Sequence, residues 1–567
     1  MNINKAFQLA YQYYQAGDLN QAGNICKKIL KVKPNNIDVL HFLGGICYQL
    51  GDYDDAIRYI KKEIEITPSN ADAFNNLGLV LQAKGLLSEA IDYFRKAITL
   101  KPHFPEAYYS LGFAYQNVGK TDEAILNYQK ALQIAPGLVE AYNNIGILLR
   151  TKGHLEESIT YLQEAIRINP KYANIYNNLG LSLKNKGNID DAIVNYQKAL
   201  DLDPDLAEAH INLGAAFLKK DEPEEAIMCY QKAIQKKPDF ADAYYNLGTL
   251  LQNKGQLDEA ITCFQKAIDL KPDFTGAYNN LGVTLKEKGQ LDEAIINFQR
   301  ALQINPDLAE VQNNLGNILA DRGQFDEAVS YYQKAIDINP DYAGAYNNLG
   351  NVLLYRGQLN EAEIYFRRAL QIKPDYSIAY SNLLFNMNYN SRHNPQTIFS
   401  EHLLFAKKFA EPLSSAISPH TNEREPNRRL RIGYVSHDFR RHPVAYFFEP
   451  VIIAHNSEYF EVFCYSNSLK HDEVTKRIQD HADQWHNIVG MSDEQVTELI
   501  RKDEIDILVD LAGHTAHNRI LVFARKPAPI QVSWIGYLAT TGLSTIDYKI
   551  VDSYTDPPGK TEQFYTE

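Results

Sequence analysis

The chain has 567 residues, of which 45% are hydrophobic, and a formal net charge of −13 at pH 7. This length allows several globular domains, or one long repeat array followed by a further domain. The negative charge argues against a general nucleic-acid binder. No apolar stretch approaches the length that crosses a bilayer, and the N-terminus lacks the pattern of a secretory signal. We therefore expect a cytoplasmic protein with no membrane and no nucleic acid among its partners.

The five cysteines are scattered and form no CxxC pair. They are Cys26, Cys47, Cys229, Cys263 and Cys464. Such spacing favours buried free thiols in a reducing compartment over disulfides.

A period of 34 residues runs through most of the chain. Glycine recurs at this spacing from Gly44 to Gly350, a small residue follows twelve positions later, and proline follows twenty-four positions later. The pattern resembles the tetratricopeptide repeat, a pair of helices that buries its apolar face only by stacking on its neighbours. Residues 1–388 are therefore predicted to form a right-handed α-solenoid of eleven full repeats and a partial twelfth. A glycine such as Gly85 suits the turn between the two helices, and Asp221 replaces it once.

Five repeats carry the letters "NNLG" in their first helix, and others carry near copies such as "NNIG" and "YNLG". The second asparagine lies two residues past the buried aromatic position, about 200° around the helix, and is predicted to face away from the buried stripe. Amides at this phase can pair with the backbone of an extended peptide in the concave groove, so extended segments of protein substrates or partners are the expected ligands. The alternative is a tolerated polar residue on a solvated face. The predicted peptide-binding residues are Asn144, Asn178, Asn212, Asn246, Asn280, Asn314, Asn348 and Asn382, with Ser110 and Phe42 as exceptions.

After residue 388 the period ends. Residues 389–428 are predicted to be a linker with one amphipathic helix near 397–410, and residues 429–567 alternate β-branched runs with helical segments. The predicted strands are "RLRIGYVS", "FEVFCYS", "IDILVDLAG", "PIQVSWIGY" and "DYKIVDS". This alternation predicts a Rossmann-like lobe with a parallel sheet, whose functional loops follow the strand ends.

Three of these loops, "SHDFRRHP", "DLAGHTAHNR" and "GYLATTG", carry the polar residues. His437 with His442, or His514 with His517, could bind a metal, but no third ligand accompanies either pair. The GxGxxG of a dinucleotide site and the GxSxG of a serine nucleophile are both absent. The remaining reading is a set of His and Asp side chains that hydrogen-bond a polar substrate.

The combination of repeats with "IGYVSHDFRRHPV", "DILVDLAGHTAHNR", "PAPIQVSWIGYLATTG" and "DYKIVDSYTDPP" resembles the nucleocytoplasmic protein O-GlcNAc transferase family and its Spindly branch. The resemblance implies a metal-independent protein O-glycosyltransferase that moves one sugar from a nucleotide-sugar to Ser/Thr, with an asparagine ladder in its solenoid. The family's active-site histidine falls on His442 and its acidic loop residue on Asp438. His514 is a weaker candidate for lining the cleft.

The resemblance leaves the donor open between UDP-GlcNAc and GDP-fucose, because "RRHPV" is closer to the GlcNAc branch and "TTGLSTIDYKIVDSYTDPP" to the Spindly branch. The family fold has two lobes, and residues 429–567 correspond to the N-terminal one. We therefore expect this chain to be a fragment that is inactive alone. The rival interpretation is a non-enzymatic tetratricopeptide scaffold with a degenerate appended domain.

Overall fold

The computed structural model describes residues 3–425, 427–553 and 559–567. Residues 554–558, which belong to the motif "DYKIVDSYTDPP", lie outside the described residues. The chain divides into two compact units, Met1–Pro272 and Asp273–Glu567. These units reflect packing and do not test the domain limits predicted from the sequence.

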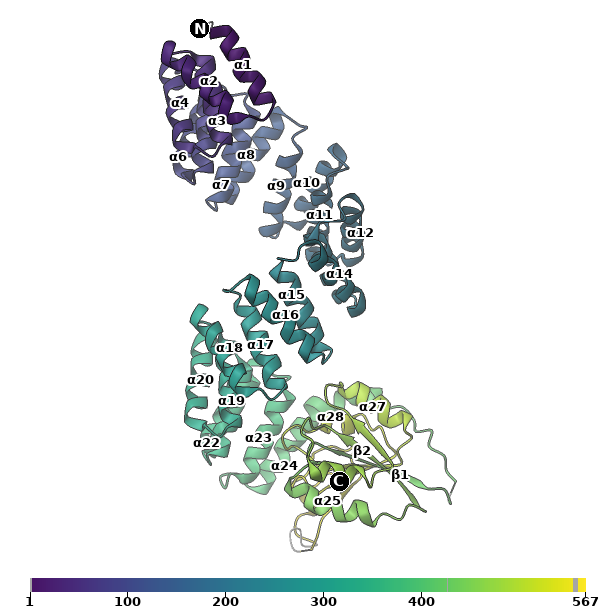
Figure 1. Cartoon of the computed structure of the whole chain (residues 1–567). Coiled ribbons are helices and arrows are strands. Elements are labelled where there is room, and N and C mark those ends of the chain that lie inside the picture. Colours follow the sequence, from purple (N-terminus) through teal and green to yellow (C-terminus); the bar gives the residue numbers. More distant parts are fainter. Residues whose placement is uncertain (1–2, 426, 554–558) are drawn as a thin grey trace. The chain divides into compact units, whose positions relative to one another are not determined.

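The first unit consists of antiparallel helix pairs, in which first helices of mostly 13 residues alternate with second helices of 14 (Figure 1). The pairs are α1 (Ile3–Gln15) and α2 (Leu19–Val32), α3 (Ile37–Gln49) and α4 (Tyr53–Ile66), α5 (Ala71–Ala83) and α6 (Leu87–Leu100), α7 (Pro105–Asn117) and α8 (Thr121–Ile134), α9 (Val139–Thr151) and α10 (Leu155–Ile168), α11 (Ala173–Lys186) and α12 (Ile189–Leu202), α13 (Ala207–Lys219) and α14 (Pro223–Lys236), and α15 (Ala241–Asn253) and α16 (Leu257–Leu270).

The second unit begins with more helix pairs and continues into a single first helix, α23. They are α17 (Thr275–Glu287) and α18 (Leu291–Ile304), α19 (Ala309–Asp321) and α20 (Phe325–Ile338), α21 (Ala343–Tyr355) and α22 (Leu359–Ile372), and α23 (Ser377–Tyr389). The predicted helix-pair array is thus confirmed. Its right-handed superhelix remains a prediction.

The turn between the helices of a pair needs a left-handed residue. Gly85 has φ +85° and Gly255 has φ +74°, and Asp221 adopts φ +61° at the same place. Asp221 therefore takes the place of the turn glycine. It adopts a left-handed backbone conformation that is energetically unfavourable for L-residues.

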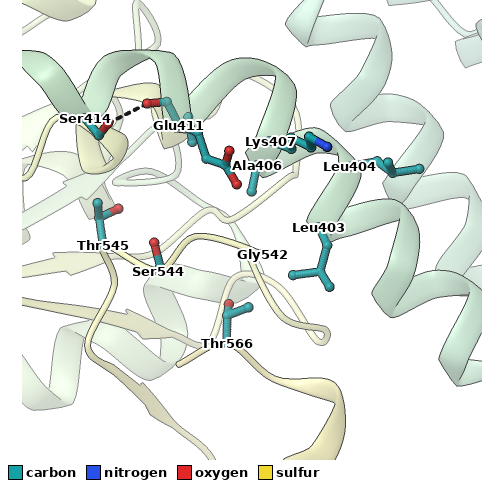
Figure 2. Close-up of a pocket in the computed structure, with 11 residues that line it drawn as sticks. Leu403, Leu404, Ala406, Lys407, Glu411, Ser414, Gly542, Ser544, Thr545 and Thr566 are labelled. Carbon is teal, nitrogen blue, oxygen red and sulfur yellow. Dashed lines mark hydrogen bonds between the residues drawn. The ribbon is translucent and has the colours of Figure 1, made fainter.

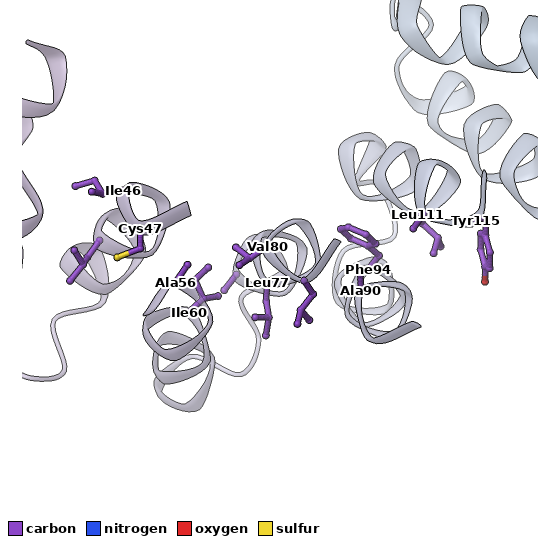
Figure 3. Packing of buried hydrophobic residues seen from close by; sticks show 14 of the residues in the cluster. Ile46, Cys47, Ala56, Ile60, Leu77, Val80, Ala90, Phe94, Leu111 and Tyr115 are labelled. Atoms are coloured by element: carbon purple, nitrogen blue, oxygen red, sulfur yellow. The ribbon is translucent and has the colours of Figure 1, made fainter. Parts of the chain in front are cut away.

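The glycine that recurs every 34 residues in the first helices is required by close packing against the second helix of the same repeat. A Cβ at Gly78 would lie 2.5 Å from the ring of Phe94, and one at Gly282 would lie 2.6 Å from the ring of Phe298. Figure 3 shows hydrophobic side chains packed between the helices of the first repeats, where Phe94 and Leu77 belong to one continuous buried cluster. The small residues predicted from the period therefore set the distance between the paired helices.

The C-terminal lobe is a six-stranded parallel sheet of order β3-β2-β1-β4-β5-β6. The strands are β1 (Leu430–Ser436), β2 (Phe460–Ser466), β3 (Gln484–Asn487), β4 (Ile507–Asp510), β5 (Ile530–Trp534) and β6 (Tyr548–Ile550). The helices between them are α25 (Pro443–Ala454), α26 (Glu473–Gln479), α27 (Asp493–Lys502) and α28 (Ile520–Ala524), and a short 3-10 turn, η3 (Glu562–Phe564), lies near Glu567. This order confirms the predicted Rossmann-like parallel sheet.

The linker between α23 and the sheet is more ordered than the sequence indicates. Helix α24 (Pro395–Phe405) continues without a break into a π-helical turn, η1 (Ala406–Ala410), and a 3-10 turn, η2 (Glu411–Ala416). Phe405 and Ala406 share one buried cluster with Leu384 of α23 and with Leu508 of β4. The last repeat helix, the linker and the sheet therefore have a common core.

Among the described residues, no helix is both long enough and apolar enough to cross a membrane. All five cysteines are unpaired, as predicted. Cys263 is only partly buried, whereas the other four thiols are buried.

Candidate functional site

The structure places the eight predicted peptide-binding asparagines on the first helices of their repeats. Each of these side chains is half-buried. We call this set of eight residues the asparagine face.

Within each unit, members of this face donate hydrogen bonds to the preceding repeat. The acceptor is often the first asparagine of that repeat's "NNLG" letters, 35 residues earlier in the chain. The bonds from Nδ2 to Oδ1 are Asn178 to Asn143 at 2.8 Å, Asn212 to Asn177 at 2.9 Å, Asn314 to Asn279 at 3.3 Å, Asn348 to Asn313 at 3.0 Å and Asn382 to Asn347 at 2.8 Å. Asn144 instead faces the hydroxyl groups of Tyr109 and Tyr128, at 3.2 and 3.3 Å.

We call each of these Asn–Asn hydrogen bonds between neighbouring repeats an asparagine clasp. The clasp gives the first asparagine a structural role that was not predicted from the sequence. Asn177 and Asn347 are 7% and 3% exposed, so their amides are buried between repeats and need partners there. The bond uses one of the two N–H donors of the second asparagine. The pair therefore joins adjacent repeats. A single such bond leaves the second asparagine one N–H donor, except at Asn348, which donates to both Asn313 and Asn317.

In the lobe, the predicted polar loops meet where the strand order reverses. Strands β1 and β4 are neighbours, and the chain proceeds from β1 toward one edge and from β4 toward the other. Such a switch point, at the carboxyl ends of the strands, is where open parallel sheets bind ligands. Asp438 and His442 follow β1, Asp510 is the last residue of β4, and His517 lies in the loop after it.

His442 occupies the N-cap of α25, just before Pro443 at the first helical position. Its side chain is 35% exposed, with Nδ1 3.5 Å from Oδ2 of Asp438 and 3.4 Å from the backbone nitrogen of Val444. Asp438 is buried, and Arg440 lies 3.3 Å from its other oxygen. Burial lowers the pKa of His442, Asp438 raises it, and the charges of Arg440 and His437 lower it.

Nδ1 of His442 has two possible uses. If it accepts from Val444, the neutral ring carries its proton on Nε2 and can only donate there. If it donates to Asp438, Nε2 is left as an acceptor and can receive a proton from a hydroxyl group. The arrangement can therefore serve as an orienting donor or as a base.

Two further histidines at the switch point form a stacked pair. The rings of His437 and His517 have centroids 4.2 Å apart, and Nδ1 of His437 lies 2.7 Å from the carbonyl oxygen of Asn467, which follows β2. Desolvation and the neighbouring His437 lower the pKa of His517, whereas Asp438 and Asp321, at the end of α19, raise it. The sequence indicated His437 and His517 as a metal ligand or a substrate-binding group, each with another histidine nearby in the chain, and did not predict that these two stack on each other.

His514 does not line an open cleft, which corrects the weaker prediction for this residue. It is fully buried, with Nδ1 3.1 Å from the hydroxyl oxygen of Ser381 on α23 and Nε2 2.9 Å from the carbonyl oxygen of Thr541. Its ring also packs edge-on against Phe405 of α24. Since both ring nitrogens are occupied in the core, His514 joins the repeats to the lobe and is not available to a substrate.

Among the described residues, the one group of three side chains spaced for a metal ion is Cys47 with Asp52 and Asp55. Burial raises the pKa of the Cys47 thiol to about 11, and Asp55 already pairs with Lys27 and Arg58. This donor set is a poor one for a metal, because thiols coordinate as thiolates.

A hollow of about 370 Å³ lies beside the linker (Figure 2). Leu403 and Leu404 form its apolar end, and Glu411 and Ser414 lie at the other end, opposite Ser544. None of the residues predicted to be catalytic lines this hollow, so it is separate from the histidine cluster at the switch point.

Comparisons with known proteins match two kinds of family model to different parts of the chain. Residues 383–567 match the model described as glycosyl transferase family 41. Models described as tetratricopeptide repeat or TPR repeat match residues 44–85, 71–104, 105–138, 148–187, 182–221, 222–255, 241–274, 273–341 and 307–375. Residues 1–63 match the model of the anaphase-promoting complex, cyclosome, subunit 3. The chain therefore carries tetratricopeptide repeats followed by a glycosyltransferase family 41 domain.

Two named relatives match a quarter to a third of the chain. The probable UDP-N-acetylglucosamine–peptide N-acetylglucosaminyltransferase SPINDLY of Petunia hybrida is 39% identical over 184 residues, which cover 32% of this chain and 20% of the relative. The probable enzyme SEC of Arabidopsis thaliana is 43% identical over 131 residues, 23% of this chain and 13% of the relative. The chain thus spans about a fifth or less of the length of these relatives. Among solved structures, a mutant O-GlcNAc transferase of Thermobaculum terrenum is 37% identical, with 52% of this chain and 56% of that chain covered and a TM-score of 0.49.

Proposed function

Because tetratricopeptide repeats precede a glycosyltransferase family 41 domain, we propose that this chain serves a protein O-glycosyltransferase. The enzyme transfers one sugar from a nucleotide-sugar to Ser or Thr of a protein that the repeats hold. UDP-GlcNAc is the proposed donor, in line with the names of the relatives, and GDP-fucose is the alternative. The free thiols support the predicted cytoplasmic location.

The observation that carries the proposal is the pairing of His442 with Asp438 at the sheet's switch point. In the proposed reaction, the Ser/Thr oxygen bonds to the anomeric carbon while the bond from that carbon to the diphosphate breaks. The hydroxyl proton passes to a base, and the nucleoside diphosphate leaves. His442 is positioned to hydrogen-bond the reacting hydroxyl through Nε2 once its Nδ1–H points at Asp438.

The transfer test uses purified protein, radiolabelled UDP-GlcNAc or GDP-fucose, and a mixture of acceptor proteins. The reading frame beyond codon 567 should be sequenced first, and both the 567-residue chain and the longest encoded chain should be assayed. We expect the longest encoded chain to place label on Ser/Thr with one donor and the 567-residue chain to place none. His442→Ala in the longest chain should lower transfer at least a hundredfold. Phe447→Ala, at an exposed position of α25, is the matched control. A frame that ends without a second lobe, together with no transfer from either donor, would favour the scaffold interpretation.

We propose that the asparagine face captures the acceptor by its backbone. Its amides are half-buried and regularly spaced within each unit, which supports recognition of extended chains irrespective of side chain. Changing Asn246, Asn280, Asn314 and Asn348 together to Ala should weaken the binding of unrelated unfolded peptides by similar factors. Circular dichroism should show unchanged helix content, since alanine favours helix. If the peptide affinity is unchanged, the asparagine face does not bind peptides, and its role is limited to the hydrogen bonds between repeats.

The metal-independent reaction remains a prediction. It is checked by adding EDTA to the transfer assay, and a loss of transfer that Mg²⁺ or Mn²⁺ restores would contradict it.

A further inference from the structure

Two half-buried cations in neighbouring repeats of the first unit lack an acidic partner. Arg150 lies in the last turn of α9 and Lys184 in the last turn of α11, and each comes four positions after the glycine that recurs every 34 residues. Nε of Arg150 is buried and has no hydrogen-bond partner among the described residues. Within the described part of the chain, neither side chain forms an ion pair. We call these two residues the cation pair.

Other cations at the ends of the same two helices do have acidic partners. Lys152 forms an ion pair with Asp122, and Nζ of Lys186 lies 2.7 Å from Oε1 of Glu156. Each of these ion pairs joins a first helix to the second helix of the preceding repeat. A helix C-terminus favours a nearby cation, and Lys152 and Lys186 already provide one. The helix ends therefore do not account for the cation pair.

Among the residues that the structure describes, no carboxylate compensates the charge of the cation pair. Burial lowers the pKa of Lys184, and the charges of Arg150 and of Lys219, at the end of α13, lower it further. Burial likewise lowers the pKa of Arg150, and only Tyr196 of α12 acts in the opposite direction. Moving a cation out of water is unfavourable unless an anion lies next to it. These surroundings therefore favour a bound anion.

The hydroxyl group of Tyr196 also lacks an acceptor. It is buried, and it has no hydrogen-bond partner among the described residues. The equivalent hydroxyl two repeats earlier, that of Tyr128, donates to Oε1 of Gln116 at 2.9 Å. In the repeat of Tyr196 the place of Gln116 is taken by Lys184, which has donors and no acceptor. This exchange leaves the Tyr196 hydroxyl, like Nε of Arg150, as a buried donor without an acceptor, which is unfavourable.

The cation pair departs from the repeat pattern. After the recurring glycines from Gly44 to Gly350, the same position carries one further cation, Lys286, which has uncharged residues in the repeats on either side. Cations in two adjacent repeats therefore occur there only once. The uncharged residues at this position are Tyr48, Gln82, Gln116, Leu218, Gln252, Ala320 and Leu354. Since the repeat frame does not require a charge at this position, the two cations have a local role.

The position of the cation pair lies beside the asparagine face. Gln116, which occupies this position one repeat before Arg150, shares the hydroxyl of Tyr128 with Asn144 of the asparagine face, at 2.9 and 3.3 Å. A ligand bound by the cation pair is therefore close to the surface that we propose for extended protein segments.

We propose that Arg150 and Lys184 bind a phosphate dianion, either free or carried by a phosphorylated side chain of a protein segment. Phosphate oxygens accept hydrogen bonds without donating any, which matches a site made of a guanidinium, an ammonium and a phenol hydroxyl. The planar guanidinium group binds two such oxygens through parallel N–H donors. This inference does not depend on the transferase proposal.

The test measures fluorescence anisotropy of two labelled Gly-Ser peptides with the 567-residue chain at low ionic strength. The peptides differ only at the central residue, which is phosphoserine in one and serine in the other. We expect the phosphoserine peptide to bind at least tenfold more tightly, because one charge-assisted hydrogen bond is worth that factor. Displacement by millimolar inorganic phosphate would show that the phosphate group alone suffices, and binding that resists displacement would show that the segment contributes as well.

The variant combines Arg150→Gln with Lys184→Gln, which installs the glutamine that other repeats carry at this position. We expect it to lose the preference for phosphoserine while its melting temperature without phosphate stays equal or rises, because two uncompensated cations are removed. The matched control combines Lys152→Gln with Lys186→Gln. It removes the same charge from the same two helix ends, and the preference should persist.

Equal binding of the two peptides to the unaltered chain, with no rise of its melting temperature in inorganic phosphate over chloride of equal ionic strength, would overturn the proposal. A preference that persists in the folded double variant of Arg150 and Lys184 would do the same. An equal loss in the control variant would show that phosphate responds to net charge and not to this site.

Discussion

His442 can receive a proton from an acceptor hydroxyl only while its imidazole is neutral, so its titration bears directly on its role. Burial holds its pKa below the ordinary value of about 6.5, and Asp438 opposes this shift. Removing the Asp438 charge destabilises the imidazolium, so Asp438→Asn should lower the pKa of His442 further. NMR titration of the side-chain carbon resonances, assigned with His442→Gln, measures both values.

The control for this titration is Asp239→Asn, an exposed change in a distant repeat, which should leave the His442 resonance unaffected. A rise of the His442 pKa in Asp438→Asn would mean that the two side chains do not interact as the 3.5 Å separation indicates.

Asp221 is the one residue other than glycine at the turn position of the repeats, and we expect it to lower the stability of the chain. It holds φ +61° where glycine holds the equivalent turns, such as Gly255 at φ +74°. A left-handed L-residue is destabilised by roughly 1–2 kcal/mol, and less for aspartate. Asp221→Gly should therefore stabilise the chain by up to about 1 kcal/mol in urea unfolding. Gly255→Asp, the reverse change at the same phase, should destabilise it, and equal effects of both changes would contradict this account.

At the scale of the element, the asparagine clasp joins neighbouring repeats and is testable as a pair. Asn212 donates to the buried Oδ1 of Asn177 at 2.9 Å. In a double-mutant cycle with Asn177→Ala and Asn212→Ala, we expect a coupling energy of about 1 kcal/mol, the usual worth of a hydrogen bond. The control pair, Asn177→Ala with Asn246→Ala, should be additive. A coupling near zero for Asn177 and Asn212 would show that the clasp contributes nothing to stability.

The helices and strands with a strong hydrophobic period were predictable from the sequence. The elements that were missed are too short or too polar to show such a period. The 34-residue frame and the β-branched runs gave the helix pairs and five of the strands in the described residues. Strand β3, "QWHN", is a polar edge strand of 4 residues, and α28 has 5 residues, so neither carries enough pattern to be found. His514 was misplaced for another reason, because its partner Ser381 lies 133 residues earlier in the chain. Local sequence cannot reveal such a contact.

At the scale of the molecule, the second unit combines the last repeats with the lobe through a buried polar joint. Tyr537 accepts a hydrogen bond from Asn388 of α23 at 2.7 Å and lies 2.8 Å from Nε2 of His402 on α24. His402 Nδ1 faces the carbonyl oxygen of Ile398, so this nitrogen donates and Nε2 accepts from the Tyr537 hydroxyl. His514, whose Nε2 donates to a carbonyl oxygen, must likewise accept from Ser381 through Nδ1. Both histidines are therefore held neutral by their partners.

This joint should weaken in acid. Burial lowers the pKa of His402 to about 4 and that of His514 to about 3, so the unfolded chain takes up protons below pH 6.5 that the folded chain refuses. Stability is therefore fully present above pH 6.5 and falls as the pH drops from there toward 4, by about 1.4 kcal/mol per pH unit for each histidine. Hydrogen exchange of residues 377–405 and 511–545 at pH 7 and pH 5 should show this loss.

The variant His514→Gln removes one of the two titrating groups. Its stability at pH 7 should fall because the buried hydrogen bonds change. Between pH 6.5 and 4, the slope of stability against pH should decrease by the contribution of one histidine. His103→Gln, at an exposed site in the third repeat, should leave the slope as it is. If the slope of His514→Gln equals that of the unaltered chain, His514 is not held neutral in the folded state. The joint would then be stabilised by packing, and acid would act on the protein elsewhere.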